Sequence, residues 1–218
     1  VNLQNFDNPE NLSKKNIYNI DIPIDLKNFS LAKKNSYIEK SFKIALNLLK
    51  KGDSLALING PISKTTFLKG KYNGITEFLA FKTRSHNEAM FLFNKNLSVS
   101  PMTTHIPINK VAQKIKKKMI INKINSINNF YKKFLGFKPR IAVTGLNPHC
   151  ETFKGKNIEK TEILPAIKIL KKKKLRILGP LSADTVFLKE NRKKFNIIVG
   201  MYHDQVLGPM KTIFGFDA

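Results

Sequence analysis

Apolar residues follow first a helical and then an extended spacing in the early part of this chain. From Ser36 the apolar positions recur at helical period, and Gly52 supplies a typical C-terminal stop. The apolar run at residues 54–58 then predicts a short buried strand that ends at the turn Asn59-Gly60-Pro61. Further upstream, apolar residues alternate over residues 20–24 and predict an edge strand, which Pro23 interrupts.

The same alternation of helical and extended patterns continues to the end of the chain. It predicts helices over residues 111–135 and 161–173, and strands over residues 89–93, 97–102, 140–144, 175–178 and 195–201. Helices that alternate with short apolar strands indicate a layered α/β domain with a largely parallel sheet. We expect one body over residues 1–218, or two lobes whose boundary the pattern does not reveal.

Polar, turn-rich motifs directly follow most of the predicted strands. They are Gly60-Pro61-Ile62-Ser63-Lys64, Thr103-Thr104-His105-Ile106-Pro107, Gly145-Leu146-Asn147-Pro148-His149, Gly179-Pro180 with Ala183-Asp184-Thr185, and Tyr202-His203-Asp204-Gln205. Ligands of open α/β sheets bind outside the carboxyl ends of the strands. We therefore expect these motifs to form the functional site.

Three of the four histidines, His105, His149 and His203, lie in these motifs. Neutral imidazoles converging at strand ends suit a divalent metal and leave open positions for substrate or water. Asp184 and Asp204 are candidates to accept the second ring N–H of a ligand histidine, or to act as bases. The alternative is that each histidine is structural, because the spacing is long-range and convergence is inferred.

Other candidate sites carry weaker signals. His86 follows no strand and is interpreted as a solvated loop residue, and Cys150 as a spectator thiol rather than a soft metal ligand. The turn at residues 60–64 resembles a phosphate-binding turn but lacks the GxxxxGK[ST] spacing. The chain has neither a GxGxxG dinucleotide fingerprint nor a GxSxG elbow that would make Ser63 a nucleophile.

The chain has 39 Lys and Arg against 15 Asp and Glu, a formal net charge of +24. Such an excess suggests a nucleic acid or an acidic surface as partner. Yet 35 of the basic residues are Lys and 4 are Arg, beside 25 Ile and 23 Asn, a bias typical of A/T-rich codons. The lysine runs at residues 116–118 and 171–174 lack interleaved aromatics. We therefore interpret them as solvated helix faces and expect no nucleic-acid partner, although the positive field suits an anionic small substrate.

Hydropathy and cysteine content indicate the cellular compartment that we expect for this protein. No apolar run approaches the roughly 18 residues of a membrane-spanning helix, and no secretory signal is visible at the start. A single cysteine excludes an intrachain disulfide and fits a reducing compartment. We expect a cytoplasmic protein with no membrane partner.

The motifs that begin at Thr103, Gly145, Gly179 and Tyr202, in this order, resemble the 4-hydroxythreonine-4-phosphate dehydrogenase family of vitamin B6 (pyridoxal phosphate) biosynthesis. The resembling stretch runs from about Tyr37 to Asp217. The resemblance implies an α/β/α fold similar to isocitrate and isopropylmalate dehydrogenases, which binds NAD without GxGxxG. It also implies a homodimer with its active site at the subunit interface.

The resemblance also assigns roles to residues. The three metal-binding histidines of the family fall on His105, His149 and His203, for a divalent ion such as Zn²⁺, Co²⁺, Mn²⁺ or Mg²⁺. Thr76 and Lys211 match substrate-binding residues of the family. Asp184 and Asp204 match acidic residues that line the same site, and with Lys211 they are the catalytic candidates.

The implied reaction is the oxidation and decarboxylation of 4-phosphohydroxy-L-threonine to 3-amino-2-oxopropyl phosphate. NAD accepts a hydride from the carbon that bears the hydroxyl, and the resulting β-keto acid loses carbon dioxide. A metal on the hydroxyl oxygen acts as Lewis acid in both steps. Lys211 is expected to pair with a substrate anion or to relay a proton.

The chain departs from the family pattern at several places. Ile75 stands where the family usually has His before Thr76, and Cys150-Glu151-Thr152 replaces a Gly-rich Ala-Gly-Glu segment. Asn59 stands where Thr is common. The opening and closing segments of the family have no counterpart before Val1 or after Ala218, so we expect a fragment of a longer reading frame.

Three alternatives stay open. The first, which Ile75 favours, is a related dehydrogenase of another four-carbon phosphorylated acid, such as threonate or erythronate phosphate. The second is a basic nucleic-acid-binding module, whose affinity would fall steeply between about 50 and 200 mM salt. The third is an inactive metal-binding scaffold.

Overall fold

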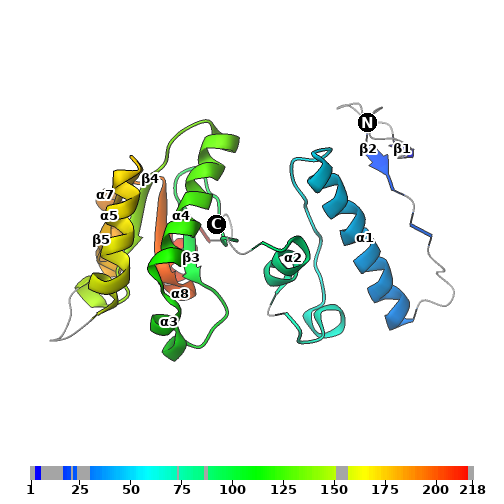
Figure 1. The fold of residues 1–218 in the computed structure, drawn as a ribbon, viewed down its shortest axis with the longest axis horizontal. Coiled ribbons are helices and arrows are strands. Elements are labelled where there is room, and N and C mark those ends of the chain that lie inside the picture. The colour runs from blue at the N-terminus through cyan, green and yellow to red at the C-terminus, as the bar shows by residue number, and fades with distance from the viewer. Residues whose placement is uncertain are drawn as a thin grey trace. The chain divides into compact units, whose positions relative to one another are not determined.

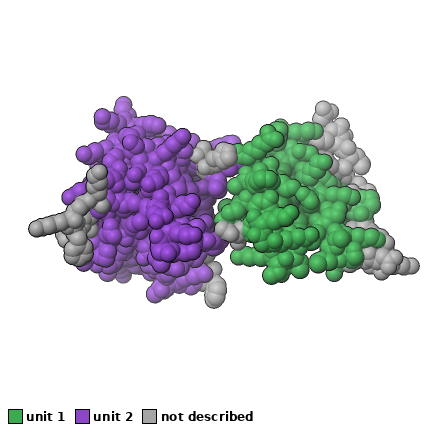
Figure 2. All heavy atoms as spheres, turned by 60° about the horizontal axis from the view of Figure 1, so that its bottom comes forward, with its two compact units in different colours: residues 1–84 green, residues 85–218 purple. Residues whose placement is uncertain are grey.

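The chain divides into two compact units, residues 1–84 and residues 85–218 (Figure 2). The division falls directly after Arg84, the C-cap of helix α2 (Ile75–Thr83). The structure, a computed structural model, describes residues 3–5, 17–20, 22–23, 30–72, 74–85, 88–150 and 157–215.

Helix α1 (Leu31–Lys51) is the longest element of the first unit (Figure 1). The Ser30 hydroxyl caps its start by accepting a hydrogen bond from the N–H of Lys33 at 3.3 Å. Gly52 ends it in the left-handed region, with φ of 87°, where glycine is unstrained. The helix predicted to end at Gly52 is therefore confirmed.

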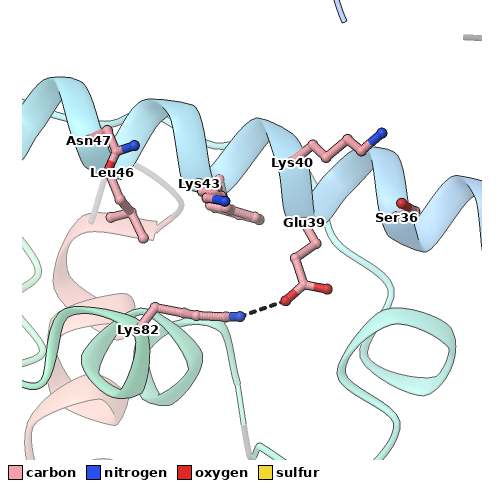
Figure 3. Close-up of a pocket in the computed structure, with 8 residues that line it drawn as sticks. Ser36, Glu39, Lys40, Lys43, Leu46, Asn47 and Lys82 are labelled. Carbon is pink, nitrogen blue, oxygen red and sulfur yellow. Dashed lines mark hydrogen bonds and ion pairs between the residues drawn. The ribbon is translucent and has the colours of Figure 1, made fainter. Parts of the chain in front are cut away.

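An aromatic cluster joins α1 to the rest of the first unit. The Phe78 ring of α2 lies edge-on to the Phe42 ring of α1 and to the Phe67 ring, with centroids 5.3 Å apart in both pairs. Phe67 belongs to the short helix η2 (Lys64–Leu68). Across a groove between the helices, Lys82 of α2 donates a hydrogen bond of 2.6 Å to Glu39 of α1 (Figure 3).

The strand predicted over residues 54–58 is wrong. This segment forms no strand, and Leu55 and Ile58 are 83% and 95% exposed. A buried strand needs neighbouring strands that accept and donate its backbone hydrogen bonds, and none of the described strands pairs with this segment. The hydrophobicity of the segment was visible in the sequence, but its missing partner was not.

A pair of short strands lies at the start of the first unit. β1 (Leu3–Asn5) pairs in parallel with β2 (Ile17–Asn19). The edge strand predicted over residues 20–24 is therefore misplaced, because β2 ends at Asn19 and the described residues Ile20, Ile22 and Pro23 are not in a strand. Ile24 lies outside the described residues.

The second unit is built on a four-stranded sheet of order β3-β6-β4-β5, in which every pair is parallel (Figure 1). Its strands are β3 (Ser98–Thr103), β4 (Arg140–Thr144), β5 (Arg176–Leu181) and β6 (Ile197–Tyr202). These are the strands predicted over residues 97–102, 140–144, 175–178 and 195–201. The predicted mixed α/β fold with a parallel sheet is confirmed.

Helices connect these strands, and a further helix follows the last strand. They are α3 (Ile108–Lys114), α4 (Lys117–Phe130), η3 (Tyr131–Leu135), η4 (Pro148–Cys150), η5 (Glu159–Ile163), α5 (Leu164–Lys172), α6 (Ala183–Val186), α7 (Lys189–Arg192) and α8 (His203–Phe214). The helix predicted over residues 111–135 is thus split into three pieces. The helix predicted over residues 161–173 corresponds to η5 and α5.

Two hydrophobic clusters cover the two faces of this sheet. Alternate residues of β6 point to opposite faces, so Ile197 and Val199 belong to one cluster and Ile198 to the other. The first cluster contains residues of α4 and α5, and the second contains Val206 and Met210 of α8. Because helices cover both faces of the sheet, the ends of its strands remain accessible.

The strand predicted over residues 89–93 is also wrong. Leu92 forms an isolated antiparallel bridge with Val99, through backbone hydrogen bonds of 2.9 and 3.0 Å. The chain reverses between them, where the Asn94 side chain accepts a hydrogen bond from the N–H of Asn96. The described residues of this segment form this one bridge and no longer ladder.

Candidate functional site

Three neighbouring parallel strands each lead into a histidine. His203 follows β6 at once, His105 comes two residues after β3, and His149 lies in η4 after β4. Because β3, β6 and β4 are adjacent and parallel, their carboxyl ends meet at one edge of the sheet. The sequence predicted these strand ends, whereas the strand order that makes them adjacent comes from the structure.

Two of these histidines have unusual backbone conformations. His105 and His149 have φ of 44° and 56°, and Cys150 has φ of 58°. A residue with a side chain is strained in this left-handed region, and such strain persists where the surroundings hold it. Three other described residues with a side chain have positive φ, namely Lys69, Arg84 and Lys174, and they lie at the ends of helices, where this conformation is common.

His105 and His203 approach each other at the strand edge. Their ring centroids are 5.9 Å apart. Nδ1 of His203 lies 2.7 Å from Oδ1 of Asp204, a hydrogen-bonding distance. A carboxylate on one ring nitrogen fixes the orientation of an imidazole and leaves its other nitrogen for a ligand.

Asp184 stands beside the third histidine. Its Oδ2 lies 3.8 Å from Nδ1 of His149, too long for a hydrogen bond but within the range of an ion pair. The Ser182 hydroxyl donates a hydrogen bond to Oδ1 at 2.5 Å. This bond, and then the charge of His149, lower the pKa of Asp184 below its ordinary value. Asp184 therefore stays anionic over the whole neutral range.

A buried glutamine ties the strand ends together. Oε1 of Gln205 accepts hydrogen bonds from the Thr144 hydroxyl at 2.9 Å and from the Met201 N–H at 2.6 Å. Its Nε2 donates to the Gly145 carbonyl at 2.8 Å. Gln205, two residues after His203, therefore joins the end of β4 to the end of β6.

A buried glutamate holds the loop that carries His149. Glu159 is 1% exposed, and its carboxylate accepts hydrogen bonds from the backbone N–H groups of Leu146 and Asn147 at 2.9 and 2.8 Å. Its other oxygen accepts from Nδ2 of Asn147 at 2.9 Å. The sequence motifs did not predict this residue. The available signal was a charged residue at helical spacing from four buried apolar residues of η5 and α5, namely Ile163, Ala166, Ile167 and Leu170.

The remaining predicted site residues lie apart from the histidines or in the other unit. Thr76 is exposed in the first turn of α2, in the first unit. Lys211 is exposed on α8, eight residues beyond His203, which corresponds to about 12 Å along the helix axis. Burial raises the pKa of the Cys150 thiol, so this residue is a poor thiolate ligand. His86 lies outside the described residues.

The donor chemistry at the strand edge fits a divalent metal. Imidazole nitrogen suits zinc, cobalt and related ions, and carboxylates stand beside two of the rings. Within the described residues, no three His, Cys, Asp or Glu side chains already lie together as a ligand group. His105 and His203 are the two rings that the structure brings into contact.

Two further observations bear on partners. The lysine runs at residues 116–118 and 171–174 are exposed, as expected for solvated helix faces. None of the described helices combines the length and hydrophobicity needed to cross a membrane.

Comparison with known proteins decides the family. The family model described as pyridoxal phosphate biosynthetic protein PdxA matches residues 1–218. The chain belongs to the PdxA family. This membership confirms the resemblance that the four motifs predicted.

Curated PdxA-family relatives carry two enzyme names. A protein of Sulfurihydrogenibium sp. named 4-hydroxythreonine-4-phosphate dehydrogenase is 40% identical over 204 residues, which are 91% of this chain and 61% of the relative. A protein of Salmonella typhimurium named D-threonate 4-phosphate dehydrogenase is 36% identical over 178 residues, 80% of this chain and 54% of the relative. The chain thus spans about three fifths or less of the length of these two relatives.

Solved structures agree with the family assignment. A 4-hydroxythreonine-4-phosphate dehydrogenase from Burkholderia phymatum has a TM-score of 0.80 and 32% identity, and the match covers 97% of this chain and 67% of that one. The enzyme of the same name from Klebsiella pneumoniae has a TM-score of 0.83 and 30% identity, with 98% and 69% coverage. A terephthalate 1,2-cis-dihydrodiol dehydrogenase from Burkholderia xenovorans, 18% identical with a TM-score of 0.72, shares the fold.

Proposed function

We propose that the complete protein is a metal-dependent, NAD-linked oxidoreductase. It oxidises and decarboxylates 4-phosphohydroxy-L-threonine to 3-amino-2-oxopropyl phosphate, in pyridoxal phosphate biosynthesis. The observation that carries the proposal is the placement of His105, His149 and His203 after three adjacent parallel strands of a PdxA-family chain. The names of the relatives support the reaction and the substrate.

Each side chain at the strand edge has a proposed task. His105, His149 and His203 hold a divalent metal, with Asp204 orienting the His203 ring. Asp184 lies beside His149, where its anionic carboxylate favours the positively charged centre. When bound, the metal supplies Lewis acidity at the substrate hydroxyl oxygen, and NAD supplies the hydride acceptor.

Two more residues are proposed to recognise the substrate. Thr76 presents an exposed hydroxyl in the first turn of α2, suited to a hydrogen bond with an oxygen of the substrate. Lys211 presents an ammonium suited to a phosphate or carboxylate, or to proton relay. The ammonium is a compact charge on a flexible stem, so it can follow an anion that changes position during the reaction.

We further propose that the protein is a homodimer with shared active sites. The offset of about 12 Å along α8 between Lys211 and His203 supports this arrangement, because a site shared between subunits does not require Lys211 to reach His203 of its own chain. A site that needs NAD and a phosphorylated metabolite also favours a cytoplasmic location.

A second substrate has a specific observation in its favour. Ile75 begins α2 next to Thr76 and has no hydrogen-bonding group for the substrate. Relatives 36% identical to this chain are named D-threonate 4-phosphate dehydrogenase. D-Threonate 4-phosphate, which has a hydroxyl in place of the amino group, is therefore the alternative substrate.

Turnover by the full-length protein tests these proposals. We expect NADH formation from 4-phosphohydroxy-L-threonine that requires a divalent metal and is lost in the His203→Ala variant. Faster turnover of D-threonate 4-phosphate would transfer the assignment to the alternative substrate. A folded, metal-loaded full-length protein that reduces NAD with neither substrate would contradict the proposed activity. Tight polynucleotide binding that collapses with salt would instead favour the nucleic-acid alternative.

A further inference from the structure

We propose that Glu159 is a positioning residue that holds the backbone of the His149 loop in the conformation needed for metal binding. The inference rests on the proposed metal site, and it assigns to a buried carboxylate a role in how that site is formed. Glu159 itself lies within η5 and touches the loop rather than the site.

The contacts of Glu159 are directed at one short segment. One carboxylate oxygen accepts hydrogen bonds from two consecutive backbone N–H groups, those of Leu146 and Asn147. The other oxygen accepts a hydrogen bond from the side-chain amide of Asn147. Hydrogen bonds to an ionised carboxylate are about twice as strong as those between neutral groups. Because Glu159 is 1% exposed, water does not compete for these three donors.

The segment held by Glu159 leads directly into a strained conformation. His149 and Cys150 both have positive φ, at 56° and 58°. Such conformations are unfavourable for residues with a side chain and persist only where neighbouring contacts fix the chain. Glu159 fixes the chain two residues before His149, while β4 fixes it before Gly145. Without the carboxylate, the loop is free to relax and carry the imidazole away from its position.

Glu162 provides a matched control on the same helix. Its carboxylate also caps backbone, accepting a hydrogen bond from the N–H of Lys117 at the start of α4 at 2.6 Å. Among the described residues, it makes no hydrogen bond to residues 145–149. Glu159→Ala and Glu162→Ala therefore remove the same group from the same helix, and both should lower stability. The first alone should change the metal site.

The first test follows the loop without metal, in the full-length protein. Amide hydrogen exchange at Leu146 and Asn147, and the three-bond HN–Hα coupling of His149, report the two hydrogen bonds and the φ angle. We expect faster exchange at both amides and a changed coupling in Glu159→Ala, and wild-type values in Glu162→Ala. Glu159→Gln keeps one carbonyl oxygen as acceptor and should fall between wild type and Glu159→Ala.

The second test is Co²⁺ binding, followed by its absorption spectrum. We expect Glu159→Ala to bind Co²⁺ about 10–100-fold more weakly than wild type, and Glu162→Ala to bind it unchanged. If Glu159 acts through His149, the loss should disappear when Glu159→Ala is added to a His149→Ala background. This double-mutant comparison separates positioning from a general loss of stability, which would add in both backgrounds.

The outcomes separate the positioning role from the metal site itself. Unchanged Co²⁺ affinity in Glu159→Ala, or an undiminished loss in the His149→Ala background, would overturn the positioning role. If the wild-type protein binds no Co²⁺, the proposed metal site fails, and the exchange and coupling data then decide the role of Glu159. Even in a protein that binds no Co²⁺, wild-type exchange rates at Leu146 and Asn147 in the Glu159→Ala variant would overturn the positioning role of Glu159.

Discussion

The carboxylate of Asp204 lies 2.7 Å from Nδ1 of His203, where β6 passes into α8. The contact joins two residues that are adjacent in the chain, so it depends on local geometry alone. With one ring nitrogen engaged, the second is the one available to a metal. The same edge of the sheet presents His105, whose ring centroid is 5.9 Å from that of His203.

Replacing Asp204 by alanine should weaken metal binding without unfolding the protein. Asp204 is exposed, so its loss removes the orienting contact with His203 and no core packing. We expect about a 10–100-fold lower Co²⁺ affinity and an unchanged melting temperature. Glu190→Ala, which removes an exposed carboxylate on α7 with a weak ion pair to Lys193, is the control and should bind Co²⁺ normally. Equal affinities in the two variants would exclude an orienting role for Asp204.

Replacing Gln205 by leucine should destabilise the second unit. The substitution leaves the Thr144 hydroxyl, the Met201 N–H and the Gly145 carbonyl without their buried partner. Each buried polar group without a hydrogen-bond partner lowers stability by roughly 1–3 kcal/mol. Chemical denaturation should therefore show that the free energy of unfolding falls by at least about 2 kcal/mol. Thr212→Val, which removes an exposed hydroxyl bonded to the Gly208 carbonyl within α8, should change stability much less. A Gln205→Leu variant as stable as wild type would show that the amide does not clamp β4 to β6.

Replacing Lys211 by alanine should impair the use of substrate and spare the metal. Lys211 is exposed and lies about two turns along α8 from His203, so its loss should leave the proposed metal ligands unchanged. We expect a higher KM or a lower kcat in steady-state kinetics, with wild-type Co²⁺ affinity. Lys168→Ala, an exposed lysine on α5, is the control. Unchanged kinetics would remove Lys211 from the site.

The Glu39–Lys82 ion pair of the first unit should contribute a small, pH-dependent stability (Figure 3). The hydrogen bond from Lys82, and then its charge, lower the pKa of Glu39. Since the folded-state pKa is depressed, the contribution is present above the ordinary glutamate value and disappears as the pH falls through the lowered one. Both side chains are partly exposed, so the effect should not exceed about 1 kcal/mol.

Urea unfolding of wild type and Glu39→Gln at several pH values measures this contribution. The difference in unfolding free energy should be constant near neutral pH and vanish in acid. Most of it should also be lost at every pH in a Lys82→Gln background, where only the weaker influence of the Lys71 charge remains on Glu39. If this difference in unfolding free energy instead grew as the pH fell, the pKa of Glu39 would be raised in the folded state. That result would contradict the prediction.

The sequence predicted the sheet of the second unit well and the first unit less well. Residues 140–144 were predicted at the bounds that β4 has, because a short apolar run between Pro139 and Gly145 is typical of a buried strand. The similar run at residues 54–58 remains exposed and unpaired among the described strands. Hydrophobicity is a local property, whereas a strand exists only with its partner.

The candidate site shows the same division between local and distant information. His105, His149 and His203 were found because each follows a predicted strand. The order β3-β6-β4, which sets them side by side, depends on crossover connections that no local pattern encodes. Glu159 and Gln205 were missed as supports, because their partners at residues 144–147 lie more than ten positions away in sequence.

Metal content of the purified full-length protein, compared with a His105→Ala/His149→Ala/His203→Ala variant, tests the central claim most directly. Both proteins should show the same secondary structure by circular dichroism. We predict about one divalent ion per chain in the wild type and none in the variant. A folded wild-type protein without metal, or a variant that retains a full equivalent, would contradict the assignment of these three histidines as a metal site.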